Sequence, residues 1–265
     1  MIAALRGLEA RQPVLARTGA AMLLVAGFCL AAMAIDPREI RGVSVWVKPA
    51  KFAASLAAWT LTMAWAWTAL APASRIGWPA RIIVAGTLGF GIFEVGWIGL
   101  RAALGEPSHF ATDALGAFAY GVMGLAALTG CLLAAGFGAL VALRGNPAME
   151  APMRAAVATG FVIAGLGGAV TGFAISANLG PYVGGLASDA GALPPFFWSR
   201  SGGDLRVAHF VAIHAMQAIP LLAWALLRAG AARPGAWIAA GSLAWMAVAI
   251  GAFAQAQAGR ALALG

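Results

Sequence analysis

The chain has 265 residues, of which 62% are hydrophobic and only 10% are charged, and its mean hydropathy is +0.87. Soluble globular domains carry about 25% charged residues, so this composition excludes that class and indicates a protein that lies in a lipid bilayer. The net charge of +8 comes mainly from arginines that stand between apolar runs rather than in one basic patch, which argues against a nucleic-acid partner.

Apolar runs long enough to cross a bilayer recur along the whole chain. We expect seven transmembrane helices in a single domain, 1–265, so the predicted fold class is an all-α polytopic transmembrane helix bundle. The expected spans are Val14–Ile35, Phe52–Ala71, Ile82–Leu100, Ala114–Leu143, Ala155–Ala177, Val207–Leu227 and Ala236–Ala256. The fourth run is longer than a straight crossing needs, so its helix must tilt, kink or begin above the membrane.

The first span has a second interpretation. Arg6, Arg11 and Arg17 precede an apolar stretch that ends in residues 32–34 (Ala-Met-Ala), a pattern similar to a signal-peptide cleavage site. Cleavage would leave six helices. The segment before the apolar stretch is long for a signal peptide, so we favour an uncleaved first helix.

Charged residues in the loops set the expected orientation. Segment 1–13 and the other loops on its side carry slightly more Lys and Arg than the opposite loops, and the excess grows when the bases of the polar cluster described below are set aside. We therefore expect a cytoplasmic N-terminus, an extracytoplasmic C-terminus and a long extracytoplasmic loop at 178–206. The Gly and Pro residues of this loop fit either a lid over the polar cluster or an unstructured connection.

The third and fifth spans are rich in small residues. In the fifth span, four of them recur at four-residue spacing: Gly160, Ala164, Gly168 and Gly172. Small residues let membrane helices approach closely, so we expect both spans inside the bundle. The same glycine-rich faces offer a contact for a homo-oligomer, and an Ala- and Gly-rich composition alone is the alternative explanation.

The third span contains a carboxylate, Glu94, about six residues inside its extracytoplasmic end, where an ionised side chain is costly unless it is paired, protonated or hydrated. Five residues recur on one helix face at spacings of three and four: Thr87, Gly91, Glu94, Ile98 and Arg101. Glu94 is therefore expected to face the interior. The alternatives for it are a structural pair with a neighbouring base and a functional binding residue.

The second span begins with the chain's two lysines, Lys48 and Lys51. Lys48 fits an anchor whose charge reaches the membrane surface. Lys51 lies one turn deeper and is the expected partner of Glu94. A modestly polar stripe, which should turn inward, follows along the same helix: Lys51, Ser55, Ala58 and Thr62.

The sixth span carries the densest polar cluster. On a straight helix, four of its side chains fall within an arc of roughly 140°: Arg206, His209, His214 and Gln217. Two histidines and a glutamine on one face inside a bilayer favour a site over simple packing. Asp204 stands just before this helix and is expected to be its N-cap, with a place in the site as the alternative.

The two histidines of this span do not by themselves form a metal motif, because their five-residue spacing differs from that of zinc-protease helices. His109, just after the third span, lies on the correct side to supply a further ligand. The set of His109, His209 and His214 would suit zinc, copper or the iron of a haem, with Glu94 as a proton carrier.

Three segments resemble a family of uncharacterised bacterial multi-spanning inner-membrane proteins. They are 48–52 (Lys-Pro-Ala-Lys-Phe), 108–110 (Ser-His-Phe) and 203–217, which runs from Gly-Asp-Leu-Arg to Gln217. The resemblance covers most of the chain. It implies a bacterial inner-membrane location and no particular activity.

The sequence leaves three functions open. The first is a membrane-embedded site that binds or translocates an ion, a proton or a small polar solute. The second is a metal- or haem-dependent membrane enzyme, and the third is a structural subunit whose buried charges fix helix register. The candidate residues of the membrane-embedded binding site, besides the histidines, are Lys48, Lys51, Glu94, Arg101, Asp204, Arg206 and Gln217.

Overall fold

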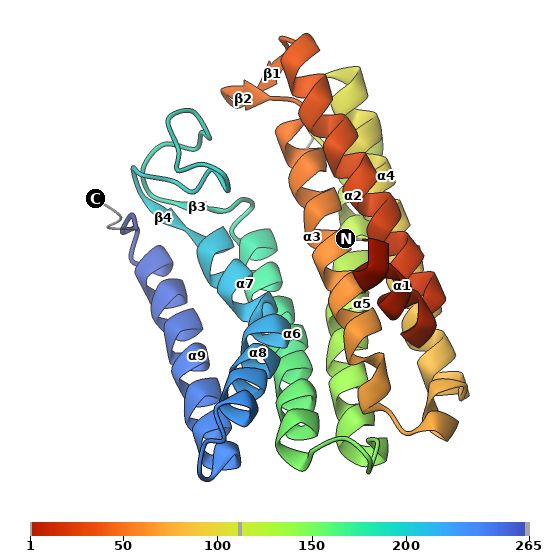
Figure 1. Cartoon of the computed structure of the whole chain (residues 1–265). Coiled ribbons are helices and arrows are strands. Elements are labelled where there is room, and N and C mark those ends of the chain that lie inside the picture. The colour runs from red at the N-terminus through yellow and green to blue at the C-terminus, as the bar shows by residue number, and fades with distance from the viewer. Residues whose placement is uncertain (1, 111–112, 263–265) are drawn as a thin grey trace.

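The computed structural model describes residues 2–110 and 113–262. Within them the chain forms an all-α bundle with short strands at one end (Figure 1). The helices are α1 (Ile2–Arg11), α2 (Pro13–Ile35), α3 (Val47–Ala66), α4 (Trp78–Leu104), α5 (Ala114–Arg144), α6 (Ala151–Ala177), α7 (Leu205–Ile213), α8 (Ala215–Arg228) and α9 (Pro234–Gln257). Two 3-10 helices, η1 (Trp67–Ala69) and η2 (Pro72–Arg75), and four strands, β1 (Glu39–Ile40), β2 (Val43–Ser44), β3 (Tyr182–Val183) and β4 (Gly203–Asp204), complete the described elements.

Five helices are long and apolar enough to cross a membrane, namely α2, α4, α5, α6 and α9. α7 and α8 meet the same criterion together, as one span bent by 46°. α3, the second expected span, has 20 residues but falls short in hydropathy, since it contains both lysines and several tryptophans and threonines. These helices indicate a membrane-embedded protein with five or six spans by this criterion, and a seventh span stays a prediction.

Most helix ends lie where the sequence signals them. Proline occupies the first turn of α2, α4, α6 and α9, where its missing N–H is no loss. Asp113 accepts a hydrogen bond from the Gly116 N–H and caps α5, and Asp204 accepts one from the Arg206 N–H and caps α7. The predicted N-cap role of Asp204 is confirmed. The long fourth span is one helix of 31 residues.

The helices pack in two groups that share α5. In the first group α2 packs along α3, and α3 packs against α4; in the second, α6 packs with α7, α8 and α9. α5 contacts both α4 and α6. Figure 1 shows the two groups side by side, with α3 opposite α7 and α8.

The main hydrophobic core lies in the half of the bundle away from the strands. Trp67 stacks on Phe137 with ring centroids 5.6 Å apart, and Phe137 meets Phe161 edge-on at 4.7 Å. Aromatic pairs of this geometry add to the gain from burial alone. The other half, which we call the β end, carries both small sheets and contains the cavity described below.

The glycine-rich face of α6 lies inside the bundle, as predicted. A Cβ atom at Gly160 would stand 2.8 Å from the Ala215 carbonyl oxygen, so only glycine lets α6 approach α8 so closely. The third span is interior along one face only. A Cβ atom added at Gly89, Gly96 or Gly99 would meet no other atom within 4 Å, so these glycines do not lie at a close helix contact.

The connection from α6 to α7, residues 178–204, is ordered, and we call it the lid segment. β3 pairs with β4 in an antiparallel sheet. The Asp189 N–H and the Ser188 hydroxyl both donate to the Arg41 carbonyl, at 3.2 Å each, and so join the lid segment to the β1–β2 hairpin. An unstructured connection is therefore wrong, and a lid over the polar cluster stays a prediction.

Candidate functional site

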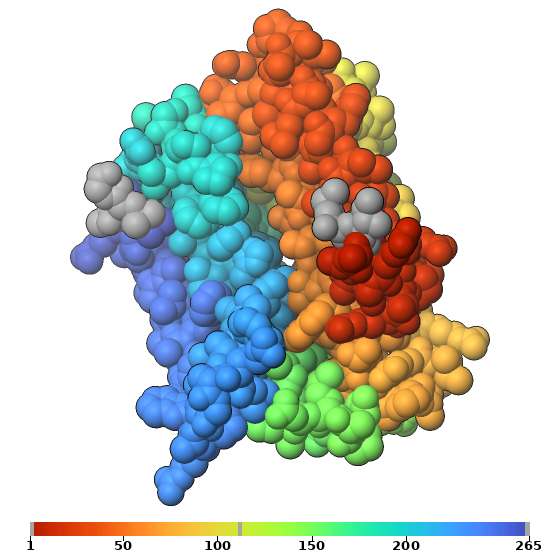
Figure 2. Space-filling view, viewed as in Figure 1, coloured from red at the N-terminus to blue at the C-terminus, as the bar shows by residue number. Residues whose placement is uncertain are grey.

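A cavity of about 150 Å³ lies between α3, α4, α5 and the bent span α7–α8. Figure 2 shows a recess on this face of the molecule between α3, in orange, and α7, in light blue. Ser55 lines the cavity and is exposed. The lining combines polar groups with aromatic walls and includes Phe52, Ser55, Trp59, Phe90, Glu94, Cys131, His209, His214 and Gln217.

Glu94 is the buried carboxylate of this cavity. Its side chain belongs to a residue that is only 5% exposed, and its Oε1 has no hydrogen-bond partner among the described residues. It lies ten residues before the end of α4, or about 15 Å along the helix axis. The face predicted from the three- and four-residue spacing is indeed buried along its length.

No base of the described residues forms an ion pair with Glu94, so the expected pairing with Lys51 is wrong. The Lys51 ammonium instead donates to the Phe196 carbonyl of the lid segment over 3.1 Å and lies 5.3 Å from the ring of Phe197. Lys48 lies 6.0 Å from the ring of Phe52. Neither lysine lines the cavity.

Arg101 shares the buried face of Glu94 but organises the loop after α4. Its guanidinium pairs with Glu106 at 2.7 Å and with Asp113 at 3.0 Å, and it donates to the Pro107 carbonyl. The Gly116 N–H and the Arg101 guanidinium hold the pKa of Asp113 below its ordinary value. Arg101 therefore supports the loop and lies outside the cavity lining.

His109 lies in the same loop, behind an aromatic wall of the cavity. Its ring centroid is 6.0 Å from that of Phe52 and 5.6 Å from that of Tyr120, and its Nδ1 is 3.2 Å from the Ser108 hydroxyl. Burial and the positive charge of Lys48 hold the pKa of His109 well below its ordinary value, so the ring is neutral.

The candidate metal ligands are not gathered at one point. His209 and His214 line the cavity, whereas His109 does not. Within residues 2–110 and 113–262, no three His, Cys, Asp or Glu side chains are arranged to hold a metal ion.

His209 has a defined tautomer because of its partner on α6. The hydroxyl of Thr171 donates its one hydrogen to the Gly167 carbonyl at 2.7 Å. Its oxygen must then accept from Nδ1 of His209, 2.9 Å away. In the neutral ring this leaves Nε2 of His209 as a hydrogen-bond acceptor.

His214 bonds a residue one turn further on. Its Nδ1 lies 3.2 Å from Oε1 of Gln217, and the amide nitrogen of Gln217 donates to the Thr62 hydroxyl at 3.0 Å. With the amide in this orientation, Nδ1 of His214 carries the proton and Nε2 is left as an acceptor. Of the polar stripe predicted to turn inward, Ser55 and Ala58 line the cavity and Thr62 bonds Gln217, whereas Lys51 contacts the lid segment instead.

The sixth span is broken at His214, between α7 and α8. The indole N–H of Trp245 donates to the Val211 carbonyl over 2.8 Å, and in an unbroken helix that carbonyl accepts from the Ala215 N–H. Pro220 removes a further hydrogen bond from α8. Both are recognised causes of kinks. The single straight arc predicted for this span is therefore wrong.

Arg206, the first member of that predicted arc, holds the lid segment in place through contacts with its residues. It pairs with Asp204 at 2.7 Å and with Asp189 at 2.8 Å, and it donates to the Phe197 carbonyl. Burial raises the pKa of Asp189, but the charge of Arg206 and hydrogen bonds from Tyr182 and Arg206 outweigh it, so the pKa lies below its ordinary value. Neither Arg206 nor Asp204 lines the cavity.

Aromatic rings connect the lid segment to the cavity. Phe196 stacks on Trp198 at 4.9 Å and contacts Phe210 at 4.7 Å, and the Phe210 ring lies 4.1 Å from that of His214. Phe210 thus lies between the rings of the lid segment and the cavity residue His214.

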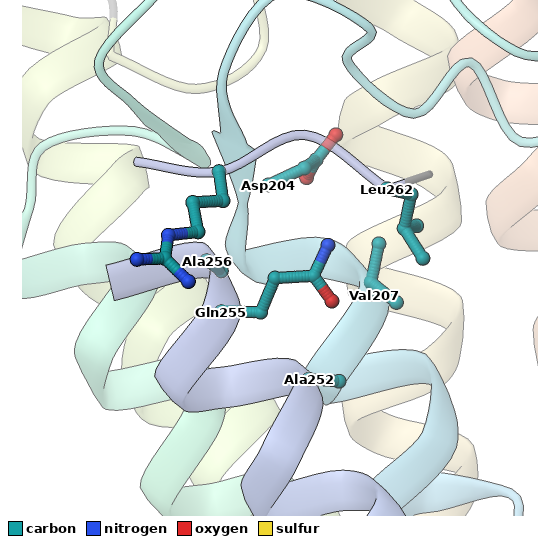
Figure 3. A pocket seen from close by; sticks show the side chains of 7 residues that line it. Asp204, Val207, Ala252, Gln255, Ala256 and Leu262 are labelled. Carbon is teal, nitrogen blue, oxygen red and sulfur yellow. The ribbon is translucent and has the colours of Figure 1, made fainter. Parts of the chain in front are cut away.

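A second hollow lies beneath the C-terminal end of α9, next to Asp204 and Gln255 (Figure 3). Its volume is about 10 Å³, which is room for at most one water molecule. The larger cavity is the candidate site.

Comparisons with protein-family models, with curated proteins and with solved structures give no match. Sequence reasoning identified the cavity's polar members Glu94, His209, His214 and Gln217, but it missed the aromatic walls and Thr171, because neither stands out in an apolar helix.

Proposed function

We propose that this protein is a multi-pass protein of a bacterial inner membrane, with seven spans, a cytoplasmic N-terminus and an extracytoplasmic C-terminus, whose Glu94 cavity binds a small polar solute or a proton for translocation. The observation that carries the proposal is the unpartnered Oε1 of Glu94, buried on the wall of a cavity. A carboxylate is costly inside a bilayer, and such residues commonly mark substrate, ion or proton pathways.

The break at His214 supports translocation rather than static binding. Secondary transporters of several folds place their substrate near the bilayer midplane, at helices that are interrupted there. Here the interruption adjoins the cavity, and His214 itself lines it. The two helix groups also meet at this place, so a relative movement of α3 and α7 would change access to Glu94.

The alternative of a purely structural subunit receives less support. Buried charges that fix helix register do so by pairing with a group on a neighbouring helix. In the part of the chain that the structure describes, Glu94 forms no ion pair, and its buried Oε1 has no hydrogen-bond partner.

The decisive test is whether water-borne molecules reach the cavity. Ser55→Cys, in a background with Cys29→Ala and Cys131→Ala, places a thiol on the cavity wall. In sealed vesicles we expect a small membrane-impermeant methanethiosulfonate reagent to modify this thiol.

Ala54→Cys in the same background is the matched control, because Ala54 is exposed on the same helix but does not line the cavity. We expect it to react at least about tenfold more slowly, since a lipid-facing thiol is poorly ionised. Equal and negligible reaction at both positions would show that the cavity does not exchange with water and would overturn the proposal.

A further inference from the structure

The hydrogen-bonding groups of the cavity are mostly acceptors. Oε1 of Glu94 has no partner, and no described residue hydrogen-bonds Nε2 of His209 or Nε2 of His214. Nε2 of His209 is an acceptor because Nδ1 carries the proton, and Nε2 of His214 is one with the Gln217 amide in the orientation described above. Buried acceptors gain most from a ligand that brings N–H or O–H donors.

The charge of the cavity points the same way. No Lys or Arg of the described residues lines it. The charge of Lys48 acts on Glu94 from outside the lining, without an ion pair between the two. Three aromatic residues, Phe52, Trp59 and Phe90, form its apolar walls, and the rings of Trp59 and Phe90 meet edge-on with centroids 6.0 Å apart. Aromatic faces attract cations, most strongly where water is excluded.

The volume limits the size of the ligand. An engineered protein cavity of roughly 150 Å³ accommodates benzene, and this cavity has about the same volume. A single ring, or an alkyl chain of similar bulk, therefore fills the space beside the polar groups.

We propose that the cavity takes a small organic cation, an amine whose ammonium group donates to Glu94 while its apolar body packs against Phe52 and Trp59, with His209 as a further acceptor in the lining. This inference rests on the proposed function and names the substrate class of that same site. The indole N–H of Trp59 also has no described partner, so a hydroxyl or ether oxygen on the amine would gain a further hydrogen bond.

The test is calorimetric titration of the detergent-purified full chain near neutral pH with three ligands of nearly equal shape. Benzylamine carries a positive charge, benzyl alcohol is neutral and benzoate is negative. We expect benzylamine to bind at least about tenfold more tightly than benzyl alcohol, and benzoate to bind least.

Two substitutions decide whether Glu94 causes the preference. Glu94→Gln keeps the shape of the side chain and removes the charge, so benzylamine and benzyl alcohol should then bind within about threefold of each other. Glu150→Gln makes the same change at an exposed helix end and should leave the wild-type preference intact.

The inference is overturned if wild-type protein binds none of the three ligands, binds them equally, prefers benzoate, or keeps its preference for benzylamine in Glu94→Gln. The thiol experiment separates this failure from failure of the proposed function. If the Ser55→Cys thiol reacts with the reagent but the protein shows no preference for benzylamine, the proposed water-accessible site stands and only the proposed substrate class is wrong.

Discussion

The indole N–H of Trp245 in α9 donates to the carbonyl of Val211 in α7 over 2.8 Å. That carbonyl lies one turn before the bend of 46° at His214. A side chain from α9 thereby occupies a position in the hydrogen-bond ladder of the sixth span, and the bend lies at His214, which lines the cavity together with Gln217. The geometry of the candidate site depends on a contact made outside it.

Trp245→Phe should weaken this bend. The substitution keeps an aromatic side chain but removes the donor, and loss of one such hydrogen bond costs about 1 kcal/mol. We expect a lower thermal unfolding midpoint in detergent and a changed rate of Ser55→Cys modification. Trp237→Phe on the same helix is the control, because Trp237 is 61% exposed and has no side-chain hydrogen bond to a described residue. Equal effects of the two substitutions would contradict the role given to Trp245.

Glu94→Gln should not destabilise the protein in the absence of ligand. Breaking a buried ion pair costs about 3–5 kcal/mol, but Glu94 has no ion-pair partner in the described residues, and the amide removes a costly charge. We expect an unchanged or higher thermal unfolding midpoint together with loss of amine selectivity. A clearly lower midpoint would favour the structural alternative.

The sequence predicts the helices well because the bilayer sets their length. The first span was expected at Val14–Ile35 and α2 runs from Pro13 to Ile35; the fourth was expected to begin at Ala114 and does. The start of α3 at Val47, five residues before the expected start at Phe52, shows the limit of the method. Its first two turns contain the two lysines, which an apolar-run criterion excludes although the helix continues through them.

The arrangement of the site could be predicted only in part. Periodicity correctly turned the Glu94 face and the Ser55 stripe inward, since both follow from helix geometry within one segment. The break at His214 depends on Trp245, 31 residues further along, and the partner of Lys51 is a backbone carbonyl of the lid segment. These contacts join residues that lie far apart in the sequence, so the residue pattern of a single segment cannot predict them.

Thr171→Val should disturb His209 without changing the shape of its surroundings. Valine lacks the oxygen that accepts from Nδ1, so a buried N–H loses its partner at a cost of about 1–3 kcal/mol, or the ring changes tautomer and presents Nε2–H to the cavity. We expect a lower thermal unfolding midpoint and weaker benzylamine binding. Thr171→Ser restores the hydroxyl and should recover most of the binding. If Thr171→Val binds benzylamine as the wild type does, the acceptor role of His209 is wrong.

Asp189→Asn should loosen the lid segment in a pH-dependent way. The pKa of Asp189 lies below its ordinary value because the charge of Arg206 and the bonds from Tyr182 and Arg206 outweigh the effect of burial. A carboxylate with a lowered pKa in the folded state stabilises the protein above its unfolded pKa of about 3.9, and this contribution is lost as the pH falls through the folded value. At pH 7 we therefore expect Asp189→Asn to have a lower thermal unfolding midpoint and faster proteolysis within residues 178–204 than the wild type. Below about pH 4 the difference should shrink towards zero. Glu39→Gln, at an exposed position in β1, should match the wild type at every pH. A pH-independent difference for Asp189→Asn would mean that its charge does not anchor the lid segment to Arg206.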